Sequence, residues 1–148
     1  MNWSRFLPRA PAEYRGSRVA LYSLVLIALV STARSLVHML ASDGGAGSIA
    51  GVAVDVAGGA NIVAMFGQWG ASQLVLAVFY WVVILRYRFL IPFSLAIVSL
   101  EQALRIAVGQ LKPLDVAAPP PGAIGSTLLL PLSLIALLVS LRDVSKAA

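Results

Sequence analysis

Four long apolar runs, separated by short polar or glycine- and proline-rich segments, dominate the chain. They cover residues 19–40, 65–85, 89–111 and 124–141. A helix needs about 20 mostly apolar residues to cross a hydrocarbon core roughly 30 Å thick, and each run is about that long. The pattern predicts an all-α fold: an integral membrane four-helix bundle formed by residues 18–142. Residues 1–17 are then a basic interfacial segment, and residues 143–148 a cytoplasmic tail.

The composition supports this class and excludes several others. Of 148 residues, 59% are hydrophobic and 11% charged, against about 25% charged in an ordinary soluble domain. The chain has no cysteine and one histidine, which removes disulfides, thiol chemistry and cysteine-ligated metals. We therefore expect no cofactor and no metal site.

Basic residues at the ends of the apolar runs predict the orientation. Eight of them fall on one side of the four spans: Arg5, Arg9, Arg15, Arg18, Arg86, Arg88, Arg142 and Lys146. The loop over 41–64 has no lysine or arginine, and the loop over 112–122 has only Lys112. The positive-inside bias then predicts cytoplasmic termini and a multi-pass inner-membrane protein. The net charge of +5 is explained by this topology, so nucleic acid is not an expected partner.

Two segments allow more than one interpretation. The first run could be a secretory signal peptide ending near Ala33, but apolar residues continue beyond that point. The apolar stretch over 49–56 lies between glycines within the outer loop. It is predicted to be a short amphipathic helix on the outer surface, with a re-entrant segment over 46–60 as the alternative.

Ionisable residues within the spans are the main candidates for function. Each costs about 2.5–3.5 kcal/mol on insertion scales, so each requires an explanation. Arg34 and His38 are spaced i, i+4 on the first span, as are Glu101 and Arg105 on the third, so each pair shares a helix face. Counting residues from the cytoplasmic side places all of them in the outer half of the membrane. The predicted ligand-binding set is Arg34, His38, Gln68, Gln73, Glu101, Gln102 and Arg105.

Three functions fit such a cluster. Two arginines and one glutamate leave a net positive charge, which suits an anionic or amphipathic small molecule or a lipid headgroup; this is the leading hypothesis. The charges could instead pair with a partner helix in a structural subunit, or simply neutralise one another. An intramembrane enzyme acting on a lipid, quinone or sterol-like substrate would use Glu101 and His38 as proton carriers. No motif of a known catalytic class accompanies them.

Small residues on the second span predict helix contact. Gly67, Gly70 and Ala71 fall on one face, where small side chains allow another helix backbone to approach closely. The approaching helix could belong to this chain, to a second copy in a homo-oligomer or to another membrane protein.

The chain resembles the small four-helix bacterial membrane proteins grouped as DoxX-like. The resemblance covers about residues 18–141. It is carried by the MFGQWG entry to the second span at 65–70, the turn with Arg86 and Arg88, and the face from Glu101 to Arg105. It implies a helical bundle and transfers no catalytic assignment.

Overall fold

The computed structural model describes residue 10 and residues 14–142. Most of the predicted interfacial segment 1–17 and all of the tail 143–148 lie outside the described residues. Within the described part the chain forms four α-helices and one short 3-10 helix, and no strand. They are α2 (Arg18–Leu40), α3 (Gly59–Leu85), η1 (Arg88–Leu90), α4 (Ile91–Leu111) and α5 (Pro121–Ser140).

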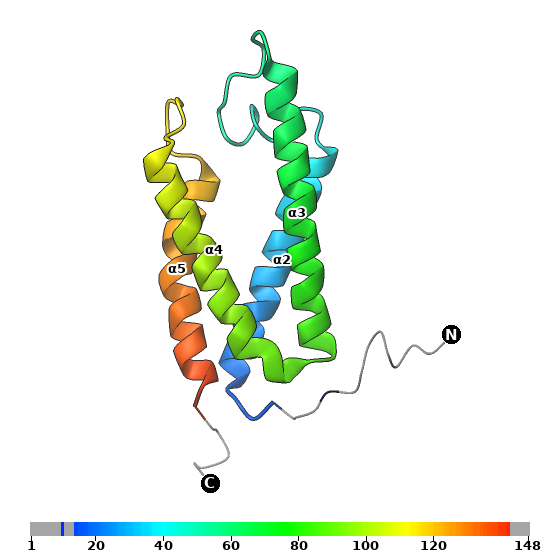
Figure 1. The fold of residues 1–148 in the computed structure, drawn as a ribbon, viewed down its shortest axis with the longest axis vertical. Helices are drawn as coiled ribbons and strands as arrows, with labels where there is room; N and C mark the ends of the chain where they lie inside the picture. Colours follow the sequence, from blue (N-terminus) through cyan, green and yellow to red (C-terminus); the bar gives the residue numbers. More distant parts are fainter. Residues whose placement is uncertain (1–9, 11–13, 143–148) are drawn as a thin grey trace, which may run out of the picture.

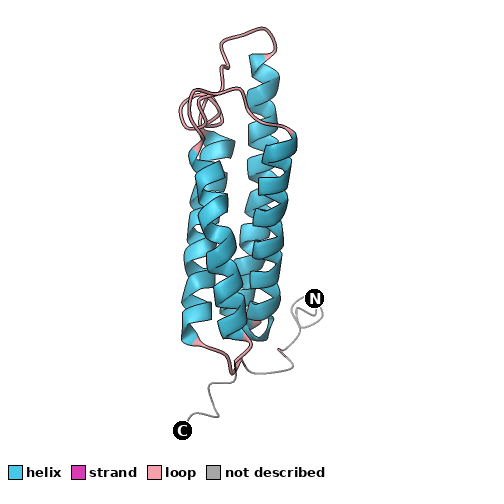
Figure 2. Ribbon diagram, turned by 90° about the vertical axis from the view of Figure 1, so that its left-hand side faces the viewer, coloured by secondary structure: helices cyan, strands magenta, loops and turns pink. Residues whose placement is uncertain are grey.

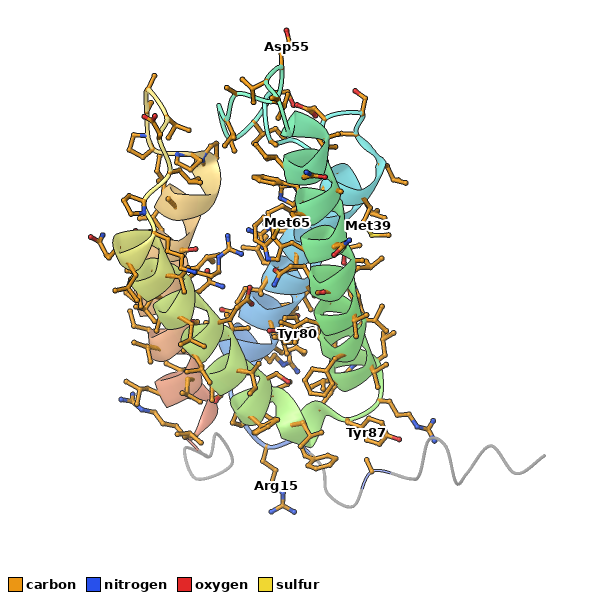
Figure 3. All side chains as sticks on the ribbon, turned by 45° about the horizontal axis from the view of Figure 1, so that its top comes forward. Arg15, Met39, Asp55, Met65, Tyr80 and Tyr87 are labelled. Carbon is orange, nitrogen blue, oxygen red and sulfur yellow. The ribbon has the colours of Figure 1, made fainter. Side chains whose placement is uncertain are left out.

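The four long helices run up and down alongside one another (Figures 1 and 2). Helix α2 packs mainly on α3, and α4 mainly on α5; fewer contacts join the two pairs, chiefly through α2. Figure 3 shows Arg15 and Tyr87 at one end of the bundle and Asp55 at the other. We call these the basic end and the loop end. The loop end carries the two connections 41–58 and 112–120.

All four helices are long and apolar enough to cross a membrane. Large apolar side chains cover much of their outer surface; Leu40, Leu85 and Leu111 are each more than 70% exposed. A soluble monomer rarely exposes so much contiguous apolar area. The prediction of an all-α protein with four potential spans is confirmed, and the exposed surface indicates a multi-pass membrane protein.

The second helix begins earlier than the predicted 65, at Gly59. Gly58 adopts a left-handed conformation with φ of 86° and forms the boundary, because glycine lacks the Cβ that disfavours this region. A Cβ on Gly59 would collide with the backbone oxygen of Val54. The glycine pair therefore starts the helix here, six residues before the predicted run begins.

The prediction of a short helix over 49–56 is wrong. Residues 41–50 form a series of turns, and residues 51–58 are irregular. Gly44, Gly45, Gly51 and Gly58 all have positive φ, and such residues interrupt the right-handed helical backbone. Backbone hydrogen bonds within the loop, such as Val52 N to Ala46 O at 2.9 Å, hold it in a compact form.

The apolar core fills the half of the bundle nearer the basic end. Its fully buried members include Leu24 from α2, Tyr80 and Val83 from α3, and Leu95 and Val98 from α4. Figure 3 shows Tyr80 inside the bundle. Beyond this core, toward the loop end, polar and charged residues replace the apolar ones on the helix faces. The bundle therefore has an apolar core in the half near the basic end and a polar layer in the half near the loop end.

Gly70 lies where α2 and α3 approach closely. A Cβ on Gly70 would lie 2.7 Å from His38 Cβ and 3.0 Å from Ser35 O, whereas one on Gly67 would lie 3.7 Å from its nearest neighbour, His38 O. Ala71 is exposed and turned away from this contact. Of the three predicted packing residues, Gly70 therefore has the tightest requirement for a small side chain.

We expect Gly70→Ala to lower the free energy of unfolding by about 1–3 kcal/mol, because the added methyl overpacks the α2–α3 contact. Gly67→Ala is the matched control, with space for the methyl; it should be neutral or stabilise by up to about 1 kcal/mol through helix propensity. Thermal unfolding in a mild detergent, followed by circular dichroism, measures both. Equal stability of the two variants would contradict the close approach at Gly70.

Candidate functional site

Two arginines from different helices meet on one tryptophan. The guanidinium carbon of Arg34 on α2 and that of Arg105 on α4 each lie 4.9 Å from the ring centroid of Trp69 on α3. This distance is well within the range of a cation–π interaction. Arg34 also donates from Nη2 to Gln73 Oε1 at 2.6 Å. Residues 69 and 73 are four apart, so Trp69 and Gln73 share the face of α3 that meets Arg34.

Helix α5 completes the group around Arg105. Arg105 donates from Nε to Ser126 Oγ at 3.0 Å, and Ser126 donates to Gly122 O at 3.0 Å. A Cβ on Gly122 would lie 3.4 Å from Arg105 Nη2 and 3.9 Å from Arg34 Nη1. Gly122 on α5 therefore lies beside both guanidinium groups. We name Arg34, Trp69, Gln73, Glu101, Arg105 and Ser126 the arginine cluster.

Glu101 supplies the carboxylate of the arginine cluster. Its Oε1 lies 3.6 Å from Arg105 Nη1, and both side chains are 19% exposed. Both atoms are buried and have no hydrogen-bond partner. The pair therefore attracts through charge without the short hydrogen bonds that make a buried pair favourable. With both arginines and Glu101 ionised, the cluster has a net charge of +1.

His38 lies on the loop side of the arginine cluster. Its ring centroid is 4.8 Å from that of Trp69 and 5.6 Å from that of Phe66. Nδ1 lies 2.7 Å from Gly44 O, a carbonyl that only accepts, so Nδ1 carries the proton. The side chain is buried. His38 therefore connects the 41–50 loop to the arginine cluster, which it contacts through Trp69.

The structure brings together only part of the predicted ligand-binding set. Arg34, Gln73, Glu101 and Arg105 lie in the cluster, and His38 borders it. Gln68 is exposed, because it lies one residue before Trp69 and so about a quarter turn away from that face. Gln102 is buried on α4, next to Glu101 in the chain.

Sequence reasoning missed two members of the arginine cluster and one glycine beside it. Trp69, Ser126 and Gly122 were not among the candidate ligand-binding residues. The spacing of Trp69 and Gln73 by one helical turn was a usable signal for the tryptophan. Nothing in the sequence distinguishes Ser126 and Gly122 from other small residues, because their role depends on how α5 packs beside α4.

The described residues contain no group of three histidine, cysteine, aspartate or glutamate side chains that could hold a metal ion. Two of the surface depressions formed by the described residues lie away from the arginine cluster. One lies at the basic end and the other between the two loops at the loop end. Neither is lined by residues of the arginine cluster.

Asp43 holds the 41–50 loop above the cluster. Its Oδ1 accepts from Gly45 N at 2.8 Å, and its Oδ2 accepts from Ser48 N at 2.6 Å. These bonds favour the ionised carboxylate and lower the pKa of Asp43 to about 2. Gly44, between Asp43 and Gly45, is the residue whose carbonyl meets His38. The carboxylate therefore helps to fix the contact between the loop and α2.

A pH-dependent stability difference follows from Asp43. Its folded-state pKa is lower than the ordinary value, so the ionised carboxylate stabilises the fold above about pH 4, and this contribution is lost as the pH falls toward 2. We expect Asp43→Asn to unfold at a lower temperature than the natural chain at pH 7, and the difference to vanish near pH 2. Thermal unfolding across this range tests it; a difference that persists at pH 2 would contradict the assignment.

Comparison of the chain with protein-family models, with curated proteins and with solved structures finds no match. The DoxX-like resemblance therefore stays a prediction.

Proposed function

We propose that this protein is a multi-pass inner-membrane protein that binds an amphipathic anion at the arginine cluster. The ligand has a carboxylate or phosphate head and an apolar tail. The single observation that carries the proposal is the convergence of Arg34 and Arg105 on Trp69, with one carboxylate for two guanidinium groups. Guanidinium groups form paired hydrogen bonds with carboxylate and phosphate, which favours these two head groups.

The depth of the cluster supports an amphipathic ligand over a water-soluble one. Arg34 lies 16 residues from the start of α2, and Trp69 lies 16 residues from the end of α3, so both are about 24 Å from the basic end. In a hydrocarbon core about 30 Å thick this is near the far interface. A lipid-like molecule in that leaflet has its head group at this level and its tail among the exposed leucines and valines of the helices.

The packing of the bundle supports an entry route between α3 and α4. Helix α3 packs chiefly on α2 and has few contacts with α4 and α5. In the cluster, Arg105 is the residue from α4 that meets α3, through its contact with Trp69. The proposed route of a head group to the cluster therefore passes between these helices, beside Arg105.

The proposed orientation places both termini in the cytoplasm. The described basic end carries Arg15, Arg18, Arg86, Arg88 and Arg142, and the only lysine or arginine in the loops at the other end is Lys112. The positive-inside bias supports this orientation. The arginine cluster then belongs to the outer leaflet.

The test uses dodecanoate and dodecyl phosphate as anionic probes and dodecanol as the uncharged control. Calorimetric titration of the purified protein in a nonionic detergent should detect both anions and not the alcohol. Arg34→Gln and Arg105→Gln should each weaken binding about tenfold or more, because a hydrogen bond to a charged group contributes about 1.5–3 kcal/mol. Arg142→Gln, at the basic end, is the matched control and should bind as the natural chain does.

Unchanged affinity in both cluster variants, or equal binding of the alcohol, would overturn the proposal. If the natural chain binds neither anion and purifies with a second polypeptide that Arg105→Gln loses, the charges serve a partner helix. The protein is then a structural subunit.

A further inference from the structure

A second basic site lies at the opposite end of the bundle from the arginine cluster. A depression of about 530 Å³ is formed where the start of α2 meets the turn between α3 and η1. The residues that line it include Tyr14, Arg18, Leu21, Leu85, Arg86 and Arg88. Three guanidinium groups thus border one concave surface, although they come from segments almost 70 residues apart in the chain.

Local hydrogen bonds fix the walls of this depression. Ser17 caps α2 by accepting from Val19 N at 3.1 Å, and the Tyr14 hydroxyl donates to Ser17 O at 3.0 Å. Arg88 donates from Nε to Ile84 O at 2.9 Å, which ties its guanidinium to the end of α3. Because the arginines are carried by a capped helix start and a tight turn, they are held near one another in the folded chain.

A glycine allows the segment before α2 to pass the end of α5. A Cβ on Gly16 would lie 2.6 Å from Ser140 O and 2.6 Å from the Tyr14 ring. Only glycine fits between these groups. Tyr14 is thereby kept against the bundle as one side of the depression.

The charge around the depression favours an anion. Among the described residues the acidic side chains are Asp43, Asp55, Glu101 and Asp115, and all four belong to the loop-end half of the bundle or its loops. The other two acidic residues of the sequence, Glu13 and Asp143, lie outside the described residues. Five described arginines outnumber them, so the basic end has a net positive charge.

The lining of the depression also includes apolar side chains. Leu85 is 74% exposed and Leu21 is partly exposed, and both belong to helices that are apolar enough to cross a membrane. Arginines beside exposed leucines in one lining match a molecule with an anionic head and hydrocarbon chains. Basic pockets between membrane helices are a known form of recognition site for anionic lipid head groups.

We propose that this depression binds the head group of an anionic phospholipid. Arg18 and Arg88 hold the phosphate, and the acyl chains lie along the exposed surface near Leu85. The site is distinct from the arginine cluster in position and composition, and it belongs to the other leaflet. The exposed Leu85 in the lining favours a phospholipid over free phosphate, which shares the phosphate chemistry but has no chains to cover this side chain.

The test is native mass spectrometry of the full chain in mild detergent with phosphatidylglycerol or phosphatidylcholine added. The natural chain should retain phosphatidylglycerol in preference to phosphatidylcholine. The double variant Arg18→Gln/Arg88→Gln should lose most of this preference, at least tenfold in the ratio of lipid-bound to free protein. The control Arg15→Gln/Arg142→Gln removes two arginines from the same end that do not line the depression, and it should keep the preference.

A second measurement uses only the natural chain, so its result does not depend on whether a variant folds. Phosphatidylglycerol should raise the thermal midpoint of the natural chain more than phosphatidylcholine does, and millimolar inorganic phosphate should not reproduce the rise. Equal loss of the lipid preference in both double variants would show a diffuse charge effect and overturn the site. Competition by inorganic phosphate that removes the bound lipid would overturn the assignment to a phospholipid.

Discussion

Replacing Glu101 by glutamine is expected to destabilise the bundle by about 3–5 kcal/mol, the range found when one partner of a buried ion pair is removed. Glutamine has nearly the same shape, so the change removes charge and little packing. Arg34 and Arg105 both lie on Trp69, and without Glu101 neither has a counter-charge within the cluster. Thermal or denaturant-induced unfolding in a mild detergent measures the loss.

The matched variant Arg105→Gln should lower the free energy of unfolding by less, about 1–3 kcal/mol. It removes hydrogen bonds and a cation–π contact, but the Glu101 carboxylate keeps Arg34 as a counter-charge. The double variant Glu101→Gln/Arg105→Gln should recover part of the loss from Glu101→Gln, since only Arg34 is then without a counter-charge. If Arg105→Gln were the more damaging single change, the cluster would not have the excess positive charge that the proposed function requires.

The same variant separates structural neutralisation from ligand binding. If an amphipathic anion binds the two arginines, dodecyl phosphate should stabilise Glu101→Gln more than the natural chain, because the bound phosphate replaces the missing carboxylate. In a purely structural cluster the added anion would have no place to bind. Both chains would then respond alike.

The sequence alone predicted the spans because membrane helices are limited by length and hydropathy. Leu40, Leu85 and Leu111 end helices in the structure at the same residues that ended the predicted runs. The start of α3 was misplaced because Gly58 and Gly59 can either break a helix or begin one. Which outcome occurs depends on the contact of Gly59 with Val54, five residues away in the loop.

The depth of the site residues was predictable from the sequence, but the helix face on which each residue lies was only partly predictable. Counting along the spans placed Arg34 and Arg105 in the same half of the membrane, and the structure joins them around Trp69. Gln68 is at a similar level but on another face of α3, where it is exposed. Depth follows from residue number, whereas the face that meets a neighbour depends on how each helix is rotated in the bundle.

Trp69 itself should be the other most sensitive position. Its ring is contacted by Arg34, Arg105 and His38, so Trp69→Leu removes the surface on which both guanidinium groups lie. We expect a loss of about 3–5 kcal/mol in the free energy of unfolding, the range for tryptophan replaced by alanine; leucine keeps part of the packing, but both cation–π contacts are lost. A desolvated cation–π contact contributes about 2 kcal/mol of such a loss for each arginine.

Trp69→Phe is the control, because phenylalanine keeps an aromatic face with a weaker attraction for cations. It should retain more than half of the stability that Trp69→Leu loses, and it should still bind dodecyl phosphate. Unfolding in mild detergent, with the calorimetric titration repeated on both variants, measures the two effects together. If leucine and phenylalanine were equally tolerated, the tryptophan would act only as a space-filling residue, and the two arginines would be held apart by α5 and Gln73 alone.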